Sequence, residues 1–132
     1  MSSFHLDLVA PEKVLFSGDV QSVIVPGTEG LFQVLSGHAP MMSALKSGVV
    51  VAVAKGETKR IFIRGGFADV SSSALTILAE HATFLSDVNL EELMKQIKNM
   101  RDDLAGSQTD TMRNATQEKL DELIALQNAL AH

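Results

Sequence analysis

Histidines are the residues of this sequence best suited to act as bases or to bind a metal ion near neutral pH. The four of them, at positions 5, 38, 81 and 132, stand far apart, with no pair at i, i+4 and no clustering with glutamate of metal-ligand type. Cysteine is absent, which removes thiolate ligands, disulfides and a thiol nucleophile together. We therefore expect no metal site, no cofactor and no catalytic residue.

His38 lies in the stretch Ser-Gly-His-Ala-Pro (36–40), where it could act as a general base. Ser36 is too close in sequence to be its simple nucleophilic partner, and the chain has no Gly-x-Ser-x-Gly elbow. A loop residue held between glycine and proline more often makes contacts, so we expect His38 to bond to backbone or to face a partner. An enzyme centred on His38 or His81 is the alternative, for which a structure should show a clustered acid, base and pocket.

Two glycine-rich stretches could bring the backbone close to a ligand. Gly27-Thr28-Glu29-Gly30 lacks the Gly-Lys-Ser/Thr ending and the following helix of a phosphate-binding loop, so it is interpreted as a turn. Gly65-Gly66 stands before Phe67, and glycine at the start of a strand more often marks a bulge or a close strand crossing. Neither stretch predicts a ligand site.

The elements that position these residues are short strands. Phe4, Leu6 and Leu8 alternate with polar neighbours, and Phe16-Ser17-Gly18-Asp19 is expected to turn the chain into a second apolar run. Short apolar runs separated by glycine turns continue to about residue 80, at 20–25, 31–35, 49–54, 60–63, 67–70 and 75–79. This pattern predicts an all-β sandwich or flattened barrel of mostly antiparallel strands, without parallel βαβ units.

The hydrophobic period changes after Ala82. Asn89 and Glu92 form a capping-box pattern, and apolar residues then recur at helical spacing over about 90–104. A polar loop at 106–110 separates this helix from a second helical pattern that runs from Ala115 through Leu130. The short loop predicts a C-terminal antiparallel α-helical hairpin, with a β-sandwich domain over 1–84 and the hairpin domain over 85–132.

Composition excludes several functions for this 132-residue chain. Its net charge of -5, its scattered basic residues and its lack of Trp and Tyr disfavour nucleic-acid binding. The N-terminus resembles neither a signal nor a transit peptide, and the longest apolar run, Val49 to Ala54, is too short to span a bilayer. The residues alone therefore predict a soluble interaction protein, for which a generic β-sandwich adaptor is one interpretation.

Seven short motifs, in order and in register over about residues 4–82, carry a more specific resemblance. They are His5-Leu6-Asp7, Phe16-Ser17-Gly18, Gly27-Thr28-Glu29-Gly30, Gly37-His38-Ala39-Pro40, Leu45-Lys46-Ser47-Gly48, Gly65 to Val70 and Thr76-Ile77-Leu78-Ala79. Together they resemble the epsilon subunit family of the F-type ATP synthase. The resemblance implies a sandwich of about ten strands, a two-helix hairpin, and a non-catalytic rotor subunit of the central stalk that binds the gamma subunit and the c ring. It also implies a peripheral position on the cytoplasmic side of a bacterial inner membrane.

The resemblance further implies which residues meet partners. Residues 28–30 and the 37–40 loop match the end of the sandwich that faces the c ring and the foot of gamma, which makes His38 a docking residue. Leu31 replaces an acidic side chain of some relatives, so a polar contact with the ring there is not expected. The partner-binding residues implied are Thr28, Glu29, Gly30, Leu31, Gly37, His38, Ala39 and Pro40.

In this family the hairpin can inhibit ATP hydrolysis, through alpha and beta subunits, and in some members it binds ATP. The nucleotide motif of those members has an acid and an arginine where this chain has Asn89 and Glu92. Because Glu92 would repel a phosphate, we expect no useful ATP binding. The hairpin is also poor in basic residues after Arg113, so we expect weak self-inhibition.

Overall fold

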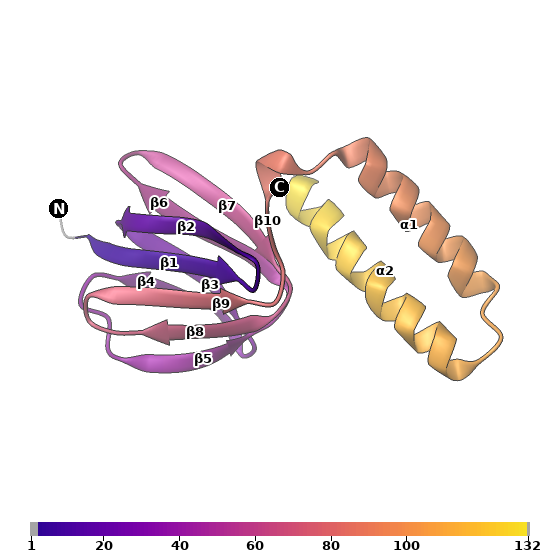
Figure 1. The fold of residues 1–132 in the computed structure, drawn as a ribbon, viewed down its shortest axis with the longest axis horizontal. Helices are drawn as coiled ribbons and strands as arrows, with labels where there is room; N and C mark the ends of the chain where they lie inside the picture. The colour runs from indigo at the N-terminus through magenta and orange to yellow at the C-terminus, as the bar shows by residue number, and fades with distance from the viewer. Residues whose placement is uncertain (1–2, 132) are drawn as a thin grey trace. The chain divides into compact units, whose positions relative to one another are not determined.

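The computed structural model describes residues 3–131, which divide into two compact units. One unit ends at Ser86 and the other begins at Asp87, two residues beyond the domain boundary predicted between residues 84 and 85. The first unit is built of strands and the second of two helices (Figure 1). The predicted fold class, a β-sandwich followed by a helical hairpin, is confirmed.

Within residues 3–86 the chain forms ten strands. A short 3₁₀ helix, η1 (Leu85–Asp87), follows the last strand and ends one residue beyond this unit. The strands are β1 (Phe4–Ala10), β2 (Lys13–Val20), β3 (Ser22–Gly27), β4 (Gly30–Leu35), β5 (Met41–Leu45), β6 (Gly48–Ala54), β7 (Glu57–Ile63), β8 (Gly66–Val70), β9 (Ala74–Ala79) and β10 (Ala82–Phe84). The expected run 20–25 begins at the end of β2 and continues as β3 after Gln21, and each of the other expected runs lies in one strand. Strands β2, β5 and β10 were not predicted. The turn expected at 16–19 is wrong, because these residues continue β2 and pair with β1.

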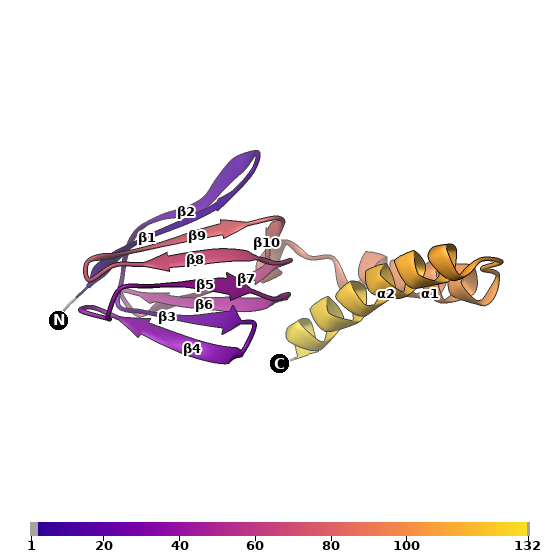
Figure 2. The ribbon, with the colours of Figure 1, turned by 90° about the horizontal axis from the view of Figure 1, so that it is seen from below.

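The hydrogen-bonded strand order is β10-β7-β6-β3-β5-β8-β9-β1-β2, with β4 also paired to β3. Figure 2 shows β1, β2, β8 and β9 on one side of the unit and β3 and β4 on the other. Strand β3 joins the two sides, because it pairs with β6 at Ser22–Ile24 and with β5 at Gly27. Pro26 lies between these pairings, where a residue without an N–H breaks no ladder bond.

The core lies between the two sides of the sandwich. Phe4, Leu6 and Leu8 are buried while His5 and Asp7 point outward, which confirms the predicted alternation along β1. Strand β1 runs parallel to β9, with Leu8 in register with Ile77, although the other pairings are antiparallel. No helix connects this parallel pair, because the chain passes through seven intervening strands before it returns.

Gly66 is the glycine that the fold most strictly requires. Its φ of +139° lies in a region that side chains rarely adopt, and a Cβ there would lie 2.1 Å from the carbonyl oxygen of Leu78. The prediction that Gly65-Gly66 marks a close crossing of strands is therefore confirmed. The tight contact lets β8 and β9 pair along their length from Gly66 and Ala79 onward.

The second unit consists of α1 (Leu90–Ala105) and α2 (Asp110–Ala131). Asn89 caps α1, since its side-chain oxygen accepts the Glu92 backbone N–H at 3.1 Å. Only this half of the predicted capping box forms among the described residues, and the Glu92 carboxylate is exposed, where water can solvate it. Helix α2 begins earlier than predicted because the Thr109 hydroxyl accepts the Met112 backbone N–H and caps it.

The two helices share one apolar cluster. Its buried members are Leu93, Ile97, Leu120 and Leu123, with Met100, Leu104 and Ile124 among the partly buried residues around them. The apolar spacing along each helix that predicted the hairpin is therefore the spacing that packs one helix on the other. Neither helix in the described part of the chain combines the length and apolar character required to cross a membrane.

Candidate functional site

The loop that holds His38 is tied to the turn between β8 and β9. Gly37, at a φ of +83°, donates its N–H to Ser72 O at 3.0 Å, and the His38 N–H bonds to Leu35 O at 3.1 Å. The ring Nδ1 of His38 lies 2.7 Å from Ala39 O, so Nδ1 carries the hydrogen, because a carbonyl can only accept. The expected bond to backbone is confirmed, and no carboxylate of the described residues pairs with His38.

Residues 27–30 form the turn between β3 and β4, as predicted. Gly27 and Gly30 face each other in register, and a Cβ on Gly27 would lie 2.9 Å from Gly30 O. Thr28 donates its N–H to Ala44 O at 3.1 Å, which ties the turn to β5, and the side chain of Glu29 is exposed. The turn exposes Thr28 and Glu29 to solvent, while its own backbone is held by β3 and β4 and by the hydrogen bond to β5.

The turn at 27–30 and the loop at 36–40 do not lie at one end of the sandwich. Strand β4 begins at the first and ends at the second, and a strand of six residues spans about 17–20 Å. Figure 2 shows the turn and the loop at opposite ends of β4. The expectation that both face one end is wrong, because the residues between them form a single extended strand without a reversal.

A groove opens between β4 and β5. The two strands diverge because β4 pairs with β3 along its length, whereas β5 meets β3 at Gly27 and otherwise pairs with β8. Leu31 and Met42 line the groove and are 70% and 72% exposed, the largest values among large apolar side chains of the described residues. The groove is lined by Gly27, Thr28, Glu29, Gly30, Leu31, Phe32, Met41, Met42, Ser43 and Ala44.

A second apolar surface, here called the outer row, crosses the β5-β8-β9-β1-β2 side of the sandwich. Its members occupy neighbouring register positions on successive strands and are Ala44, Phe67, Leu78, Val9 and Val14. Phe67, Leu78 and Val14 are each more than half exposed. The sequence prediction missed this row, although Phe67 and Leu78 occupy the positions that alternate with the buried residues of their strands.

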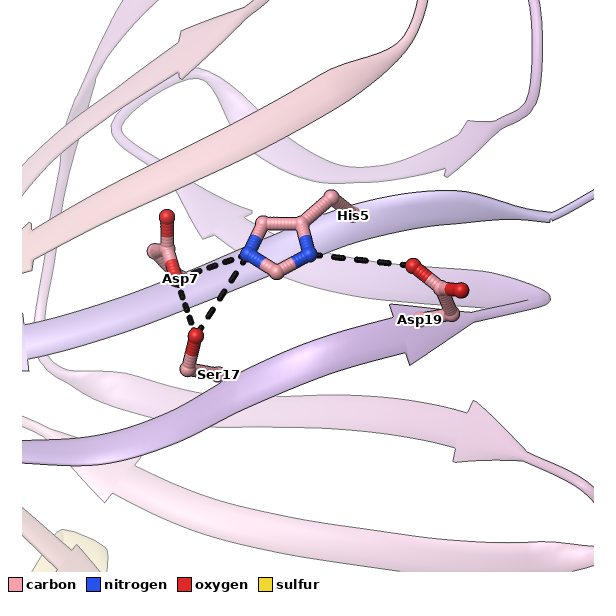
Figure 3. A network of polar contacts seen from close by, with 4 residues as sticks. All are labelled: His5, Asp7, Ser17 and Asp19. Carbon is pink, nitrogen blue, oxygen red and sulfur yellow. Dashed lines mark hydrogen bonds and ion pairs between the residues drawn. The ribbon is translucent and has the colours of Figure 1, made fainter.

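A polar cluster joins β1 and β2 near the start of the chain (Figure 3). Ser17 donates its hydroxyl to Asp7 Oδ1 at 2.6 Å, and His5 Nε2 lies 3.0 Å from the same oxygen. The other ring nitrogen, Nδ1, lies 3.7 Å from Asp19 Oδ1. His5 is in register with Asp19 and Asp7 with Ser17, so the four side chains form a box across two strands.

The cluster controls the charge of Asp7. The Ser17 hydrogen bond, then the His5 hydrogen bond and charge, hold the pKa of the Asp7 carboxyl below its usual range, and partial desolvation opposes them. Serine, histidine and aspartate are also the residue types of a nucleophilic triad. However, Ser17 directs its hydrogen to Asp7 and lies 3.4 Å from His5 Nε2. The His5 and Asp7 side chains are also nearly half exposed on an open strand surface. These three residues are therefore not arranged as a nucleophilic triad.

The sequence contained a signal for this cluster. His5 and Asp7 alternate along one strand, and Ser17 and Asp19 do the same along the next, so both pairs point to one face once the strands are paired. The expected turn at 16–19 concealed this pairing. No group of three or more histidine or acidic side chains in the described part of the chain is arranged to hold a metal ion.

The start of α1 holds the two positions that depart from the nucleotide motif. The Asn89 side chain is engaged in capping the helix, and Glu91 and Glu92 are exposed in the first turn. Their negative charges face the positive end of the helix dipole, the place where a phosphate would otherwise bind. Residues 87–132 carry nine acidic and five basic residues, compared with seven and six in residues 1–86.

Comparisons with known proteins cover nearly the whole chain. The family described as "ATP synthase, Delta/Epsilon chain, beta-sandwich domain" matches residues 3–85. The ATP synthase epsilon chain of Maricaulis maris (strain MCS10) is 40% identical over 128 residues, which is 97% of this chain and 96% of the relative. That of Rhodopseudomonas palustris (strain TIE-1) is 42% identical over 130 residues, 98% of this chain and 96% of the relative.

Two cryo-EM structures share the fold. A chain of the Euglena gracilis mitochondrial ATP synthase, in a structure of OSCP, F1 and the c-ring in rotational state 1, superposes with a TM-score of 0.86 at 23% identity. The match covers 98% of this chain and 82% of that one. A chain of the Tetrahymena thermophila mitochondrial central stalk and c-ring gives a TM-score of 0.68 at 12% identity, with 98% and 97% covered. At these identities the likeness concerns the fold alone.

Proposed function

Because this chain belongs to the epsilon-chain family of the ATP synthase, we propose that it docks the gamma subunit onto the membrane c ring and couples ion-driven rotation to ATP synthesis. The resemblance first identified from seven ordered motifs is confirmed by identities near 40% over nearly the whole chain. An epsilon chain is a non-catalytic subunit of the complex, in agreement with the prediction. The observation that carries the proposal is this full-length similarity, combined with exposed apolar surfaces on a rigid sandwich.

We assign the two ends of β4 to different partners. The groove between β4 and β5, with Thr28 and Glu29 at its turn, is proposed to meet the c ring, and the loop that holds His38 is proposed to meet gamma. The separation along β4 supports this division, since the turn and the loop lie about 17–20 Å apart, at opposite ends of one strand. The exposed Leu31 and Met42 favour a largely apolar contact at the groove.

The outer row is proposed as the main contact for gamma on the sandwich. Phe67 and Leu78 are in register on adjacent strands and more than half exposed, which favours an apolar partner. A face made of paired strands also presents these side chains in fixed positions, as a rotor that transmits torque requires. The remaining cell-level prediction, a peripheral position on the cytoplasmic side of a bacterial inner membrane, is proposed to follow from binding to these partners.

A binding experiment with purified gamma subunit tests the proposal. Phe67→Ser is expected to weaken gamma binding about tenfold or more, because the proposed interface loses an aromatic anchor that it would bury. His38→Ala is expected to alter gamma binding or the coupling of proton pumping to ATP hydrolysis, while the catalytic head keeps its intrinsic activity. Met112→Ser, which truncates a similarly exposed side chain in α2, is the matched control. Failure of the unmodified chain to bind gamma would contradict the proposed function.

The hairpin is proposed to regulate ATP hydrolysis weakly, through contacts to alpha and beta subunits. An inserted hairpin that meets acidic segments of those subunits needs positive charge, yet the hairpin unit has an excess of four acidic residues. The start of α1 likewise lacks the arginine that would pair with a nucleotide phosphate. Both features favour a hairpin that neither binds ATP usefully nor inhibits strongly.

A further inference from the structure

His5 stands between two carboxylates that come from different strands. Its Nε2 lies 3.0 Å from Asp7 Oδ1 on β1, and its Nδ1 lies 3.7 Å from Asp19 Oδ1 on β2 (Figure 3). We propose that His5 is a proton-dependent brace, which in its charged form bridges Asp7 and Asp19 and holds β2 on β1. This inference does not depend on the identity of any partner subunit.

The protonation state decides how many of these contacts are favourable. A neutral imidazole has one N–H and one lone pair, whereas an ionised carboxylate only accepts hydrogen bonds. In the neutral ring, one nitrogen therefore turns a lone pair toward a carboxylate oxygen. An imidazolium has an N–H on each nitrogen and can donate toward both Asp7 and Asp19. Ser17 does not relieve the conflict, because its hydroxyl hydrogen is directed to Asp7.

The charged residues near His5 are acidic, so a proton on its ring would offset their negative charge. On β9, the residue in register with His5 is Ala74, which carries no charge. On β8, Asp69 is in register with Thr76, which is itself in register with Asp7. The charged groups paired with His5 from β1 and β2 are thus Asp7 and Asp19, and the next charged group across β9, Asp69 on β8, is also acidic.

The position of β2 explains why a brace matters there. Strand β2 comes last in the strand order and is hydrogen-bonded to β1. Its ladder with β1 is interrupted by a register shift between Leu8 and Val9, so the regular pairing is confined to Phe4–Leu8 opposite Phe16–Val20. The box of four polar side chains lies on this regular part. Its strength should therefore influence how often β2 separates from β1.

The two kinds of group define a pH window. Histidine carries its proton below about pH 6.5, and a carboxyl ionises above about pH 4. The pKa of Asp7 is lowered, so its charge persists to the acidic limit of this window and is lost as the pH falls below it. The complete brace needs a charged ring and two ionised carboxylates, so it is expected at mildly acidic pH and weakens on both sides.

Hydrogen exchange of the full chain, measured by NMR as protection factors at several pH values, tests the proposal. Amides of β2 are expected to show protection about two- to fivefold higher near pH 5 than near pH 8, the range for an exposed ion pair. Amides of the β6–β7 hairpin serve as the internal reference, and ring ¹⁵N shifts report the protonation of His5 directly.

Two variants separate the brace from a general effect of pH. His5→Gln cannot gain a proton, and Asp19→Asn removes the carboxylate on β2, so each is expected to abolish the extra protection of β2 near pH 5. Both side chains are exposed on the strand surface, so the fold should tolerate the changes. The proposal is overturned if β2 protection, relative to the reference hairpin, is the same at both pH values, or if either variant retains the wild-type pH dependence.

Discussion

Single residues in this protein show how backbone conformation restricts side-chain choice. Gly66 allows β8 and β9 to approach closely, because a Cβ at this position would collide with the backbone of Leu78 and Ala79. Gly56, in the β6–β7 turn, has a φ of +80° but open space around the position of its absent Cβ. The two glycines thus separate the cost of an unusual φ from the cost of a steric clash.

Gly66→Ala is expected to lower the free energy of unfolding by at least about 2 kcal/mol, because backbone strain and a clash with backbone atoms add together. Gly56→Ala, the matched control, is expected to lose about 1 kcal/mol from the unusual φ alone. Urea denaturation of the full chain measures both. Equal losses in the two variants would show that the close approach at Gly66 relaxes at no cost.

The Asp7 carboxylate contributes to the stability of the fold in a way that depends on pH. Its pKa is lowered in the folded state, so the folded carboxylate contributes stability above the ordinary aspartate pKa of about 3.9, and this contribution disappears as the pH falls through the lowered value. Asp7→Asn is therefore expected to reduce the urea midpoint at pH 7 but not at pH 2. A variant that is equally destabilised at both pH values would contradict this assignment.

At the scale of elements, β4 and α1 each changed the interpretation of a predicted site. Because β4 is a continuous strand, the turn at 27–30 and the loop at 36–40 are held at its opposite ends, and they are proposed to meet different partners. Helix α1 begins with an occupied cap at Asn89 and two glutamates in its first turn. The part of a helix that most readily binds a phosphate is therefore already neutralised.

ATP is expected not to bind the isolated full-length subunit at cellular nucleotide concentrations, because Glu91 and Glu92 repel phosphate at the helix start. Calorimetric or NMR titration with ATP measures this directly. A double variant that replaces both glutamates with glutamine keeps the helix and removes the repulsion, so it shows whether charge alone prevents binding. Saturable binding to the unmodified chain would disprove the prediction.

At the scale of the whole molecule, the two units differ in charge and in the way they are stabilised. The sandwich has a closed apolar core that includes Leu6, Ile61 and Ile77, and its charges nearly balance. The hairpin unit depends on one cluster between its helices and carries most of the net negative charge. We expect the rigid unit to support docking and the acidic unit to contribute little inhibition.

Deletion of residues 88–132 is expected to leave binding to gamma intact and to raise the ATPase rate of the assembled enzyme only modestly, by less than about tenfold, which corresponds to 1.4 kcal/mol. The ATPase rate of the complex, assembled with either the full chain or the truncated chain, measures the effect. The outer row and the groove belong to the retained unit, so gamma binding is the internal control. A larger rise in rate would show strong self-inhibition by the hairpin.

Features that depend on residues close together in the chain could be predicted from the sequence. The alternation of Phe4, Leu6 and Leu8 predicted a strand with one buried face, and Asn89 predicted the start of α1. The ordered glycine motifs also identified the family. The prediction missed the cap at Thr109, because a single hydroxyl before a polar stretch is a weak signal.

Which distant residues share a surface could be learned from the folded chain but not from local patterns. His5 meets Asp19, Phe67 meets Leu78, and β1 lies parallel to β9 because of strand order and register. Strand order and register depend on pairings between segments far apart in the chain, which no local pattern specifies. For the same reason, the extended strand between Gly30 and Leu35 separates two loops that the resemblance had placed together.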